Sequence, residues 1–167
     1  DVVFVPHEEL NNLDELLAFE AKALELGYEG IMMRTPWGHY KHNRCTWLDE
    51  IIYKLKRFQD DEGLIIGFEE QQTNTNKQER DERGYAKRSS SKEGLVGANT
   101  LGSFIVDYKG QTIFVAPGVF THKQRKEIWD HQDLYKFQPL KFRFFGYGVK
   151  DLPRFPRAIG FRNKMDM

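Results

Sequence analysis

The spacing of strand-like segments after Lys56 restricts the fold more than any other feature of the sequence. Four apolar stretches in this part of the chain have the composition of buried strands. They are residues 62–70, 103–116, 141–148 and 154–162. The second stretch is long enough for a hairpin with its turn near Lys109 and Gly110, so the four stretches supply about five strands.

A short helix is expected among these strands. Thr121 and Gln124 occupy the two side-chain positions of a capping box, and the residues after them can continue a helix. Five strands with one inserted helix are typical of an oligonucleotide-binding (OB) barrel. An SH3-like barrel is the structural alternative.

A long polar insert, residues 71–100, separates the first two barrel strands. Loops of this length inside a compact domain are uncommon and are usually functional or disordered. The stretch RGYAKRSSSK within the insert has no acidic residue and combines bases, hydroxyls and one aromatic ring, which a phosphate backbone can use. The candidate DNA-binding residues are Arg83, Tyr85, Lys87, Arg88, Ser89 and Lys92. The same composition also fits a solvated, disordered loop.

The N-terminal part of the chain has a different pattern, with a helix between strands. The expected elements are a helix over residues 11–27 and strands over residues 30–34 and 48–55. Either asparagine at the helix start can cap it, and Gly27 can close its end. We therefore expect an α+β chain, with an α/β segment over residues 1–58 and a barrel domain over residues 59–167.

The segment YKLKRF, residues 53–58, places two lysines on one side of a strand. Successive side chains alternate along a strand, so Ile52, Lys54 and Lys56 share a face. Burying an unpaired ammonium costs several kcal/mol, so this face needs either solvent or an anion. A polyphosphate would fit. The alternative is an exposed edge strand, where lysines discourage aggregation.

Glu29 directly precedes the strand GIMMR, at the mouth of the expected sheet. A carboxylate there could reach a hard cation or a ribose. Arg34, Lys41 and Arg44 add positive charge in the residues that follow. The chain contains a single cysteine, Cys45, which excludes an internal disulfide, and it has no Cys/His spacing typical of a metal site.

The two ends of the chain carry opposite charge although the net charge is zero. Residues 1–30 contain eight acidic residues and one lysine, whereas residues 136–164 contain eight basic residues and one aspartate. This asymmetry favours an anionic partner for the basic end, most commonly nucleic acid. No apolar run is long enough for a membrane span, and the N-terminus lacks signal-peptide features, so we expect no membrane and a cytoplasmic protein.

Three segments in order resemble motifs of the ATP-dependent DNA ligases. EGIMMR (residues 29–34) resembles motif IV, YKLKRF resembles motif V, and RFPRAIGFR (residues 154–162) resembles motif VI. The similarity extends over most of the chain, including the polar insert. It implies the C-terminal part of a nucleotidyltransferase (adenylation) domain over residues 1–58, followed by an OB-fold domain with a latch insert at about residues 71–100.

The resemblance also implies roles for individual residues. In this family a lysine attacks ATP to form lysyl-AMP, AMP passes to the 5′-phosphate at a nick, and the 3′-hydroxyl then displaces AMP. Glu29 matches the acidic residue that serves the divalent metal, expected to be Mg²⁺. Lys54 and Lys56 match the lysines that hold the nucleotide phosphate and stabilise charge in phosphoryl transfer, so the catalytic residues implied are Glu29, Lys54 and Lys56. The phosphate-binding residues implied are Arg44, Lys54, Lys56, Arg154 and Arg162. The latch residues would enter the major groove of nicked duplex DNA.

One departure from the family pattern limits these implications. Motif I, K-x-D-G, supplies the nucleophilic lysine of the family and occurs nowhere in the 167 residues. We therefore expect the chain to be inactive without an N-terminal nucleotidyltransferase segment. We also expect a monomer. Its expected location is the cytoplasm, or the nucleus or a viral factory if the protein comes from a virus of eukaryotes. The alternatives are a non-catalytic OB-fold nucleic-acid-binding module and an RNA ligase or capping-type nucleotidyltransferase.

Overall fold

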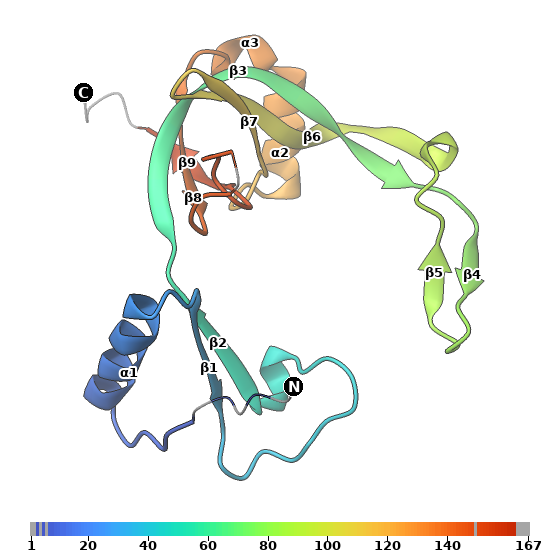
Figure 1. Ribbon diagram of the computed structural model, residues 1–167. Coiled ribbons are helices and arrows are strands. Elements are labelled where there is room, and N and C mark those ends of the chain that lie inside the picture. Colours follow the sequence, from blue (N-terminus) through green and yellow to red (C-terminus); the bar gives the residue numbers. More distant parts are fainter. Residues whose placement is uncertain (1–2, 4, 6, 149, 163–167) are drawn as a thin grey trace. The chain divides into compact units, whose positions relative to one another are not determined.

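The computed structural model describes residues 3, 5, 7–148 and 150–162. The chain forms two compact units, Asp1–Arg57 and Phe58–Met167 (Figure 1). No helix in the described part of the chain is both long and apolar enough to cross a membrane.

The first unit consists of one helix and a two-stranded sheet. Its elements are α1 (Leu13–Glu25), β1 (Gly30–Arg34), the short 3₁₀ helix η1 (Trp47–Asp49) and β2 (Ile52–Lys56). Asn12 caps α1, as expected, because its side-chain oxygen accepts a 2.9 Å hydrogen bond from the backbone N–H of Glu15. β1 and β2 pair antiparallel, with Gly30 opposite Lys56 and Met32 opposite Lys54.

We expected a strand to begin at residue 48, and this predicted start is wrong. Residues 47–49 form η1, and Glu50 after it has a left-handed backbone, with φ of 51°. An extended strand cannot pass through such a residue, so β2 begins only at Ile52.

The second unit is a five-stranded antiparallel sheet in the order β7-β6-β3-β8-β9. The strands are β3 (Gln59–Asn74), β6 (Leu95–Tyr108), β7 (Gln111–Val115), β8 (Pro139–Phe144) and β9 (Arg157–Phe161). Beyond the end of β7, Ala116 forms a parallel bridge with Arg157, with hydrogen bonds to Pro156 and Ala158. This bridge joins the two edge strands, so the sheet closes into a barrel and the OB-fold prediction is confirmed.

Turns and caps of the barrel lie where the sequence indicated. Lys109 and Gly110, with φ of 53° and 78°, form the tight turn between β6 and β7. Thr121 and Gln124 form a capping box at the start of α2 (His122–Asp130), and α3 (Gln132–Tyr135) follows it.

The bounds of four strands differ from those expected, and one of them, β6, begins at Leu95 instead of residue 103. β3 begins earlier and runs further than residues 62–70, because it pairs with β8 at one end and with β6 along the other. β8 ends at Phe144 and β9 starts at Arg157. Gly146 and Phe155, with φ of 64° and 53°, interrupt the extended backbone between these two strands.

The core of the second unit fills the barrel with aromatic and aliphatic side chains. On β8, Leu140, Phe142 and Phe144 are buried, and the residues between them face outward. Phe104 of β6 is fully buried, and the centre of its ring lies 5.6 Å from the centre of the Phe120 ring. Fully burying each such side chain stabilises the fold by about 1.5–3 kcal/mol.

The insert forms an arm that extends from the barrel strands (Figure 1). The far ends of β3 and β6 pair with each other as far as Asn74 and Leu95. Between them lie β4 (Gln78–Arg80), β5 (Ala86–Arg88) and the 3₁₀ helix η2 (Lys92–Gly94). β4 and β5 pair antiparallel, so the latch-like insert is a hairpin.

Candidate functional site

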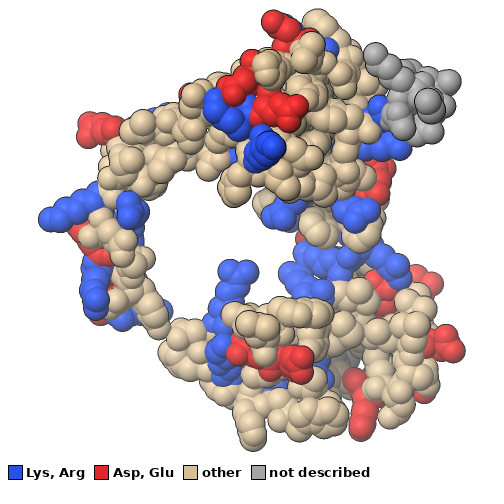
Figure 2. All heavy atoms as spheres, turned by 180° about the vertical axis from the view of Figure 1, so that it is seen from behind, with Lys and Arg blue, Asp and Glu red and all other residues tan. Residues whose placement is uncertain are grey.

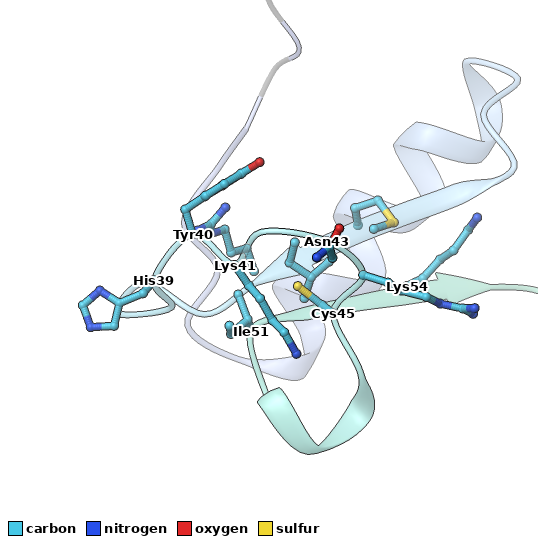
Figure 3. Close-up of a pocket in the computed structure, with 11 residues that line it drawn as sticks. His39, Tyr40, Lys41, Asn43, Cys45, Ile51 and Lys54 are labelled. Atoms are coloured by element: carbon cyan, nitrogen blue, oxygen red, sulfur yellow. The ribbon is translucent and has the colours of Figure 1, made fainter. Parts of the chain in front are cut away.

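A cavity of about 490 Å³ lies beside the two strands of the first unit (Figure 3). Four basic side chains, those of Arg34, Lys41, Arg44 and Lys54, are among its lining residues. None of the lining residues is acidic. Low-dielectric walls with charge of one sign raise the local concentration of anions, so this cavity is suited to an anionic ligand.

The antiparallel ribbon places one wall of the cavity. Ile52 and Lys54 both line it, as expected for residues two apart on a strand, and Met32 lines it from the register position opposite Lys54. Figure 3 shows Lys54 on β2, with Lys41, Asn43 and Cys45 on the loop that follows β1. Lys54 is exposed and takes part in none of the ion pairs among the described residues.

The loop between β1 and β2 carries Lys41 and Arg44 to the cavity, and Arg34 lies at the end of β1. Its two ends are joined because the backbone N–H of Thr35 donates to the carbonyl of Ile51 at 3.0 Å, and the Thr35 hydroxyl donates to the carbonyl of Glu50 at 3.1 Å. The guanidinium of Arg34 donates to the carbonyl of Gly38 at 2.9 Å. These hydrogen bonds therefore hold the first and last residues of the loop next to each other.

Asp49 organises the far part of the same loop, and our sequence interpretation missed it. Its Oδ2 atom accepts hydrogen bonds from Lys41 Nζ at 2.6 Å, from the backbone N–H of Thr46 at 2.6 Å and from the Thr46 hydroxyl at 2.8 Å. The hydrogen bond from Lys41, followed by those from Thr46, lowers the pKa of Asp49 to about 2. The T-x-x-D spacing of a capping box was the available signal.

The structure brings two of the expected catalytic residues together. Lys56 Nζ forms an ion pair with the carboxylate of Glu29, which directly precedes β1. Gly30 allows this approach, because a Cβ at that position would collide with the carbonyl oxygen of Leu55. The Glu29 side chain remains 58% exposed, so its carboxylate is accessible from solvent.

Glu29 can supply one ligand to Mg²⁺, which is usually bound through one or two carboxylates together with waters and substrate phosphates. Within the part of the chain that the structure describes, no group of three or more His, Cys, Asp or Glu side chains is arranged to hold a metal. The accessible carboxylate therefore fits a metal shared with a phosphate ligand.

The end of β2 is anchored to the helix by a second ion pair. Arg57 donates to both carboxylate oxygens of Glu20, with a 2.9 Å bond from Nε to Oε1. Glu20 is 1% exposed, and it is the buried residue of α1. This contact fixes the residue that follows Lys56.

The two arginines of the motif VI resemblance lie in the second unit. Arg162 pairs with Glu62 of β3 through Nη1. Arg154 lies in the loop between β8 and β9, where its backbone N–H donates to the carbonyl of Gly146 at 3.0 Å. Its guanidinium lies 5.8 Å from the centre of the Phe155 ring. The structure therefore assigns these arginines to the barrel unit, and Arg44, Lys54 and Lys56 to the other unit.

The expected DNA-binding residues of the arm divide into two groups. The guanidinium of Arg88 donates to the carbonyls of Asn74 and Asn76, each at 3.2 Å, and the carbonyl of Ser89 accepts from the side chains of the same two asparagines. Arg88 and Ser89 thus stabilise the end of the hairpin that joins the barrel strands. The others are Arg83, Tyr85, Lys87 and Lys92, and all six residues are exposed. Figure 2 shows Lys and Arg side chains gathered on this arm.

Residues 96–162 match the family model described as DNA ligase OB-like domain. This match confirms the DNA ligase resemblance that the motifs indicated. A comparison with curated protein sequences gives no match.

Several solved structures are similar to the chain. Chlorella virus DNA ligase-adenylate is 33% identical, over 94% of this chain and 49% of that chain, with a TM-score of 0.49. A structure from work on Lig E DNA ligases is 19% identical over 92% and 48%, with a TM-score of 0.60. The structure named Pmar-Lig PreS3 is 22% identical over 89% and 30%, with a TM-score of 0.63. The last two similarities support the fold, and the chain spans about half the length of the chlorella virus enzyme.

Proposed function

We propose that this chain, whose residues 96–162 belong to the DNA ligase OB-like domain family, is the DNA-clamping and phosphate-binding part of an ATP-dependent DNA ligase. Such a ligase seals nicks in duplex DNA through lysyl-AMP and DNA-adenylate intermediates. The observation that carries the proposal is the cavity beside β1 and β2, which both Lys54 and Arg44 line and whose lining contains no acidic residue. These are two of the residues that the motifs predict for phosphate binding.

The chemistry assigned to the first unit is electrostatic. Lys54 and Arg44 would hold the oxygens of a phosphate, and Lys56 would stabilise the charge that develops during phosphoryl transfer. In the absence of a ligand, Lys56 pairs with Glu29. ATP and Mg²⁺ would supply the adenylyl group and a further positive charge at the phosphates, with Glu29 as a metal ligand. Arg154 and Arg162 of the second unit would contact the nucleotide phosphates.

The proposal divides the parent enzyme between this chain and another segment. Residues 1–58 would complete a nucleotidyltransferase domain, and residues 59–167 would form the OB-fold domain, with the arm at about residues 71–100 as a latch on the duplex. The nucleophilic lysine would come from an N-terminal segment that contains K-x-D-G, since the motif does not occur in these 167 residues.

Reconstitution tests this division. The chain is mixed with the N-terminal half of the related chlorella virus ligase, which supplies the nucleophile, and then with ATP, Mg²⁺ and a nicked duplex with a 5′-phosphate. We expect labelled AMP to appear on the N-terminal segment, and sealing to require both pieces. A mixture that binds DNA but forms neither adduct nor sealed product contradicts the ligase assignment.

A non-catalytic nucleic-acid-binding module is the second candidate, favoured by the OB barrel and the exposed bases of its arm. It predicts salt-dependent binding to duplex or single-stranded DNA without preference for a nick. An RNA ligase or capping-type enzyme predicts instead tighter binding to RNA. Competition among nicked DNA, intact DNA and RNA of equal length separates the three candidates.

A further inference from the structure

We propose that Asp49 is a positioning residue for the cavity beside β1 and β2. Its carboxylate fixes the loop that presents Arg44, so that Arg44 and Lys54 can bind one phosphate group together. This inference rests on the proposed function, because it requires that the cavity bind phosphate.

The hydrogen bonds of Asp49 close a short loop around Arg44. One carboxylate oxygen accepts from Lys41 before Arg44 and from the backbone and hydroxyl of Thr46 after it. Both flanks of Arg44 are therefore tied to the same atom. Charge-assisted hydrogen bonds of this kind are stronger than neutral ones. With a pKa of about 2, Asp49 stays ionised at every pH at which the protein would work.

The backbone conformation of this loop requires stabilising hydrogen bonds. Asn43 and Glu50 have left-handed backbones, with φ of 77° and 51°. Asparagine adopts this conformation readily, whereas a glutamate such as Glu50 holds it where the surrounding structure imposes it. Asp49 lies between these two residues in sequence and holds the segment that joins them. Without its carboxylate the loop would relax and move Arg44 away from Lys54.

A positioning role and a simple charge effect predict opposite results when Asp49 is neutralised. Asp49 does not line the cavity, but its partner Lys41 does. Through charge alone, Asp49→Asn would leave Lys41 uncompensated beside the cavity, and an anion would bind more tightly. Through positioning, the same substitution would weaken binding because Arg44 is no longer held in place.

The experiment is calorimetric titration of the whole chain with inorganic pyrophosphate. We expect Asp49→Asn to bind roughly 10-fold to 100-fold more weakly than the wild type, since loss of a group that orients a ligating residue has effects of this size at metal sites. Asp60→Asn is the matched control. Asp60 is also a carboxylate bonded to a basic residue, Arg143 at 2.7 and 2.9 Å, but it lies in the second unit. The affinity of Asp60→Asn for pyrophosphate should equal that of the wild type.

A second pair of variants keeps the test valid if Asp49→Asn fails to fold. Thr46→Val removes the hydroxyl donor and keeps the backbone donor, whereas Thr46→Ser keeps both. We expect pyrophosphate to bind Thr46→Val several-fold more weakly than the wild type and to bind Thr46→Ser equally well. Equal affinities for these two variants, like unchanged or tighter binding by Asp49→Asn, overturn the positioning role.

The failure of the proposed phosphate site gives a different result. Lys54→Ala should abolish pyrophosphate binding if the cavity is that site. If the wild type does not bind pyrophosphate, or if Lys54→Ala binds it normally, the phosphate site is wrong and the role of Asp49 falls with it. Abolished binding in Lys54→Ala together with normal binding in Asp49→Asn overturns the role of Asp49 alone.

Discussion

Lys56 forms an ion pair with Glu29 at the open end of the β1–β2 ribbon. Gly30, which follows Glu29, is opposite Lys56 in the antiparallel register, so the pairing of the strands itself brings the two charges together. In the proposed enzyme, Lys56 would leave this carboxylate to meet a phosphate, and Glu29 would become free for a divalent cation. In the structure, each of these two groups compensates the charge of the other.

Replacing Lys56 should impair catalysis much more than folding. An exposed ion pair contributes about 0–1 kcal/mol, so Lys56→Ala should leave the melting temperature nearly unchanged. Removing a charge that stabilises the transition state should slow AMP transfer by about 100-fold or more in the reconstituted enzyme. The measurements are single-turnover adenylylation and a thermal melt. Lys123→Ala, on the exposed side of α2, serves as the control and should change neither quantity. A lowered melting temperature in Lys56→Ala would point to a structural role.

The Glu20–Arg57 pair should respond unequally to the removal of each partner. Glu20 is 1% exposed and Arg57 is 61% exposed. Arg57→Ala leaves a buried carboxylate without its partner and should destabilise the first unit by about 3–5 kcal/mol. Glu20→Gln keeps an acceptor for an arginine that water can reach, and should destabilise it by about 1 kcal/mol. Urea unfolding followed by tryptophan fluorescence measures both. Equal destabilisation by the two variants would show that the burial of Glu20 does not determine how much the ion pair contributes to the free energy of unfolding.

Local sequence patterns predicted much of the fold for physical reasons. Caps act within one helical turn, so Asn12 and Thr121 could be recognised without knowledge of the rest of the chain. The alternation of side chains along a strand likewise placed Ile52 and Lys54 on one wall of the cavity. The number of strands and the inserted helix predicted an OB barrel, with an SH3-like barrel as the alternative.

Two kinds of feature were not predicted. The start of β2 is set locally by the left-handed Glu50 after a capped 3₁₀ turn, whose T-x-x-D signal was missed. Other features depend on distant contacts, which local patterns do not reveal. The Glu29–Lys56 pair joins residues 27 positions apart and follows from strand register. Arg88 is still predicted to contact DNA, and its guanidinium also bonds to backbone carbonyls of residues 12 and 14 positions earlier. Basic composition alone does not distinguish these two roles.

Alkaline pH should destabilise the barrel through Tyr108. Burial raises the pKa of Tyr108 to about 12, with a further contribution from its 2.6 Å hydrogen bond to Asp61. The unfolded chain releases this proton near pH 10, so stability from Tyr108 is full below pH 10 and is lost as the pH rises toward 12. Melting temperatures between pH 8 and pH 12 should fall more steeply for the wild type than for Tyr108→Phe. Tyr28→Phe, at an exposed tyrosine of the first unit, should follow the wild type.

Removing the arm should lower duplex affinity and its dependence on salt. The deletion of residues 74–94 removes the bases Arg83, Lys87, Arg88 and Lys92, among others. The slope of log affinity against log salt falls by about 0.9 for each phosphate that the protein no longer neutralises, so it should fall by about 4 if all four bases bind phosphates. Binding to a nicked duplex is measured by fluorescence anisotropy between 50 and about 200 mM salt.

Two single substitutions in the arm separate phosphate binding from support of the hairpin. Lys87 is exposed, so Lys87→Ala should reduce the salt slope by about 1 without altering stability. Arg88→Ala should also loosen the hairpin, because its guanidinium holds the carbonyls of Asn74 and Asn76. Faster amide exchange in residues 78–88 would reveal that loosening. An unchanged affinity and slope in the arm deletion, despite an intact barrel, would mean that the arm does not contact DNA and that the latch assignment is wrong.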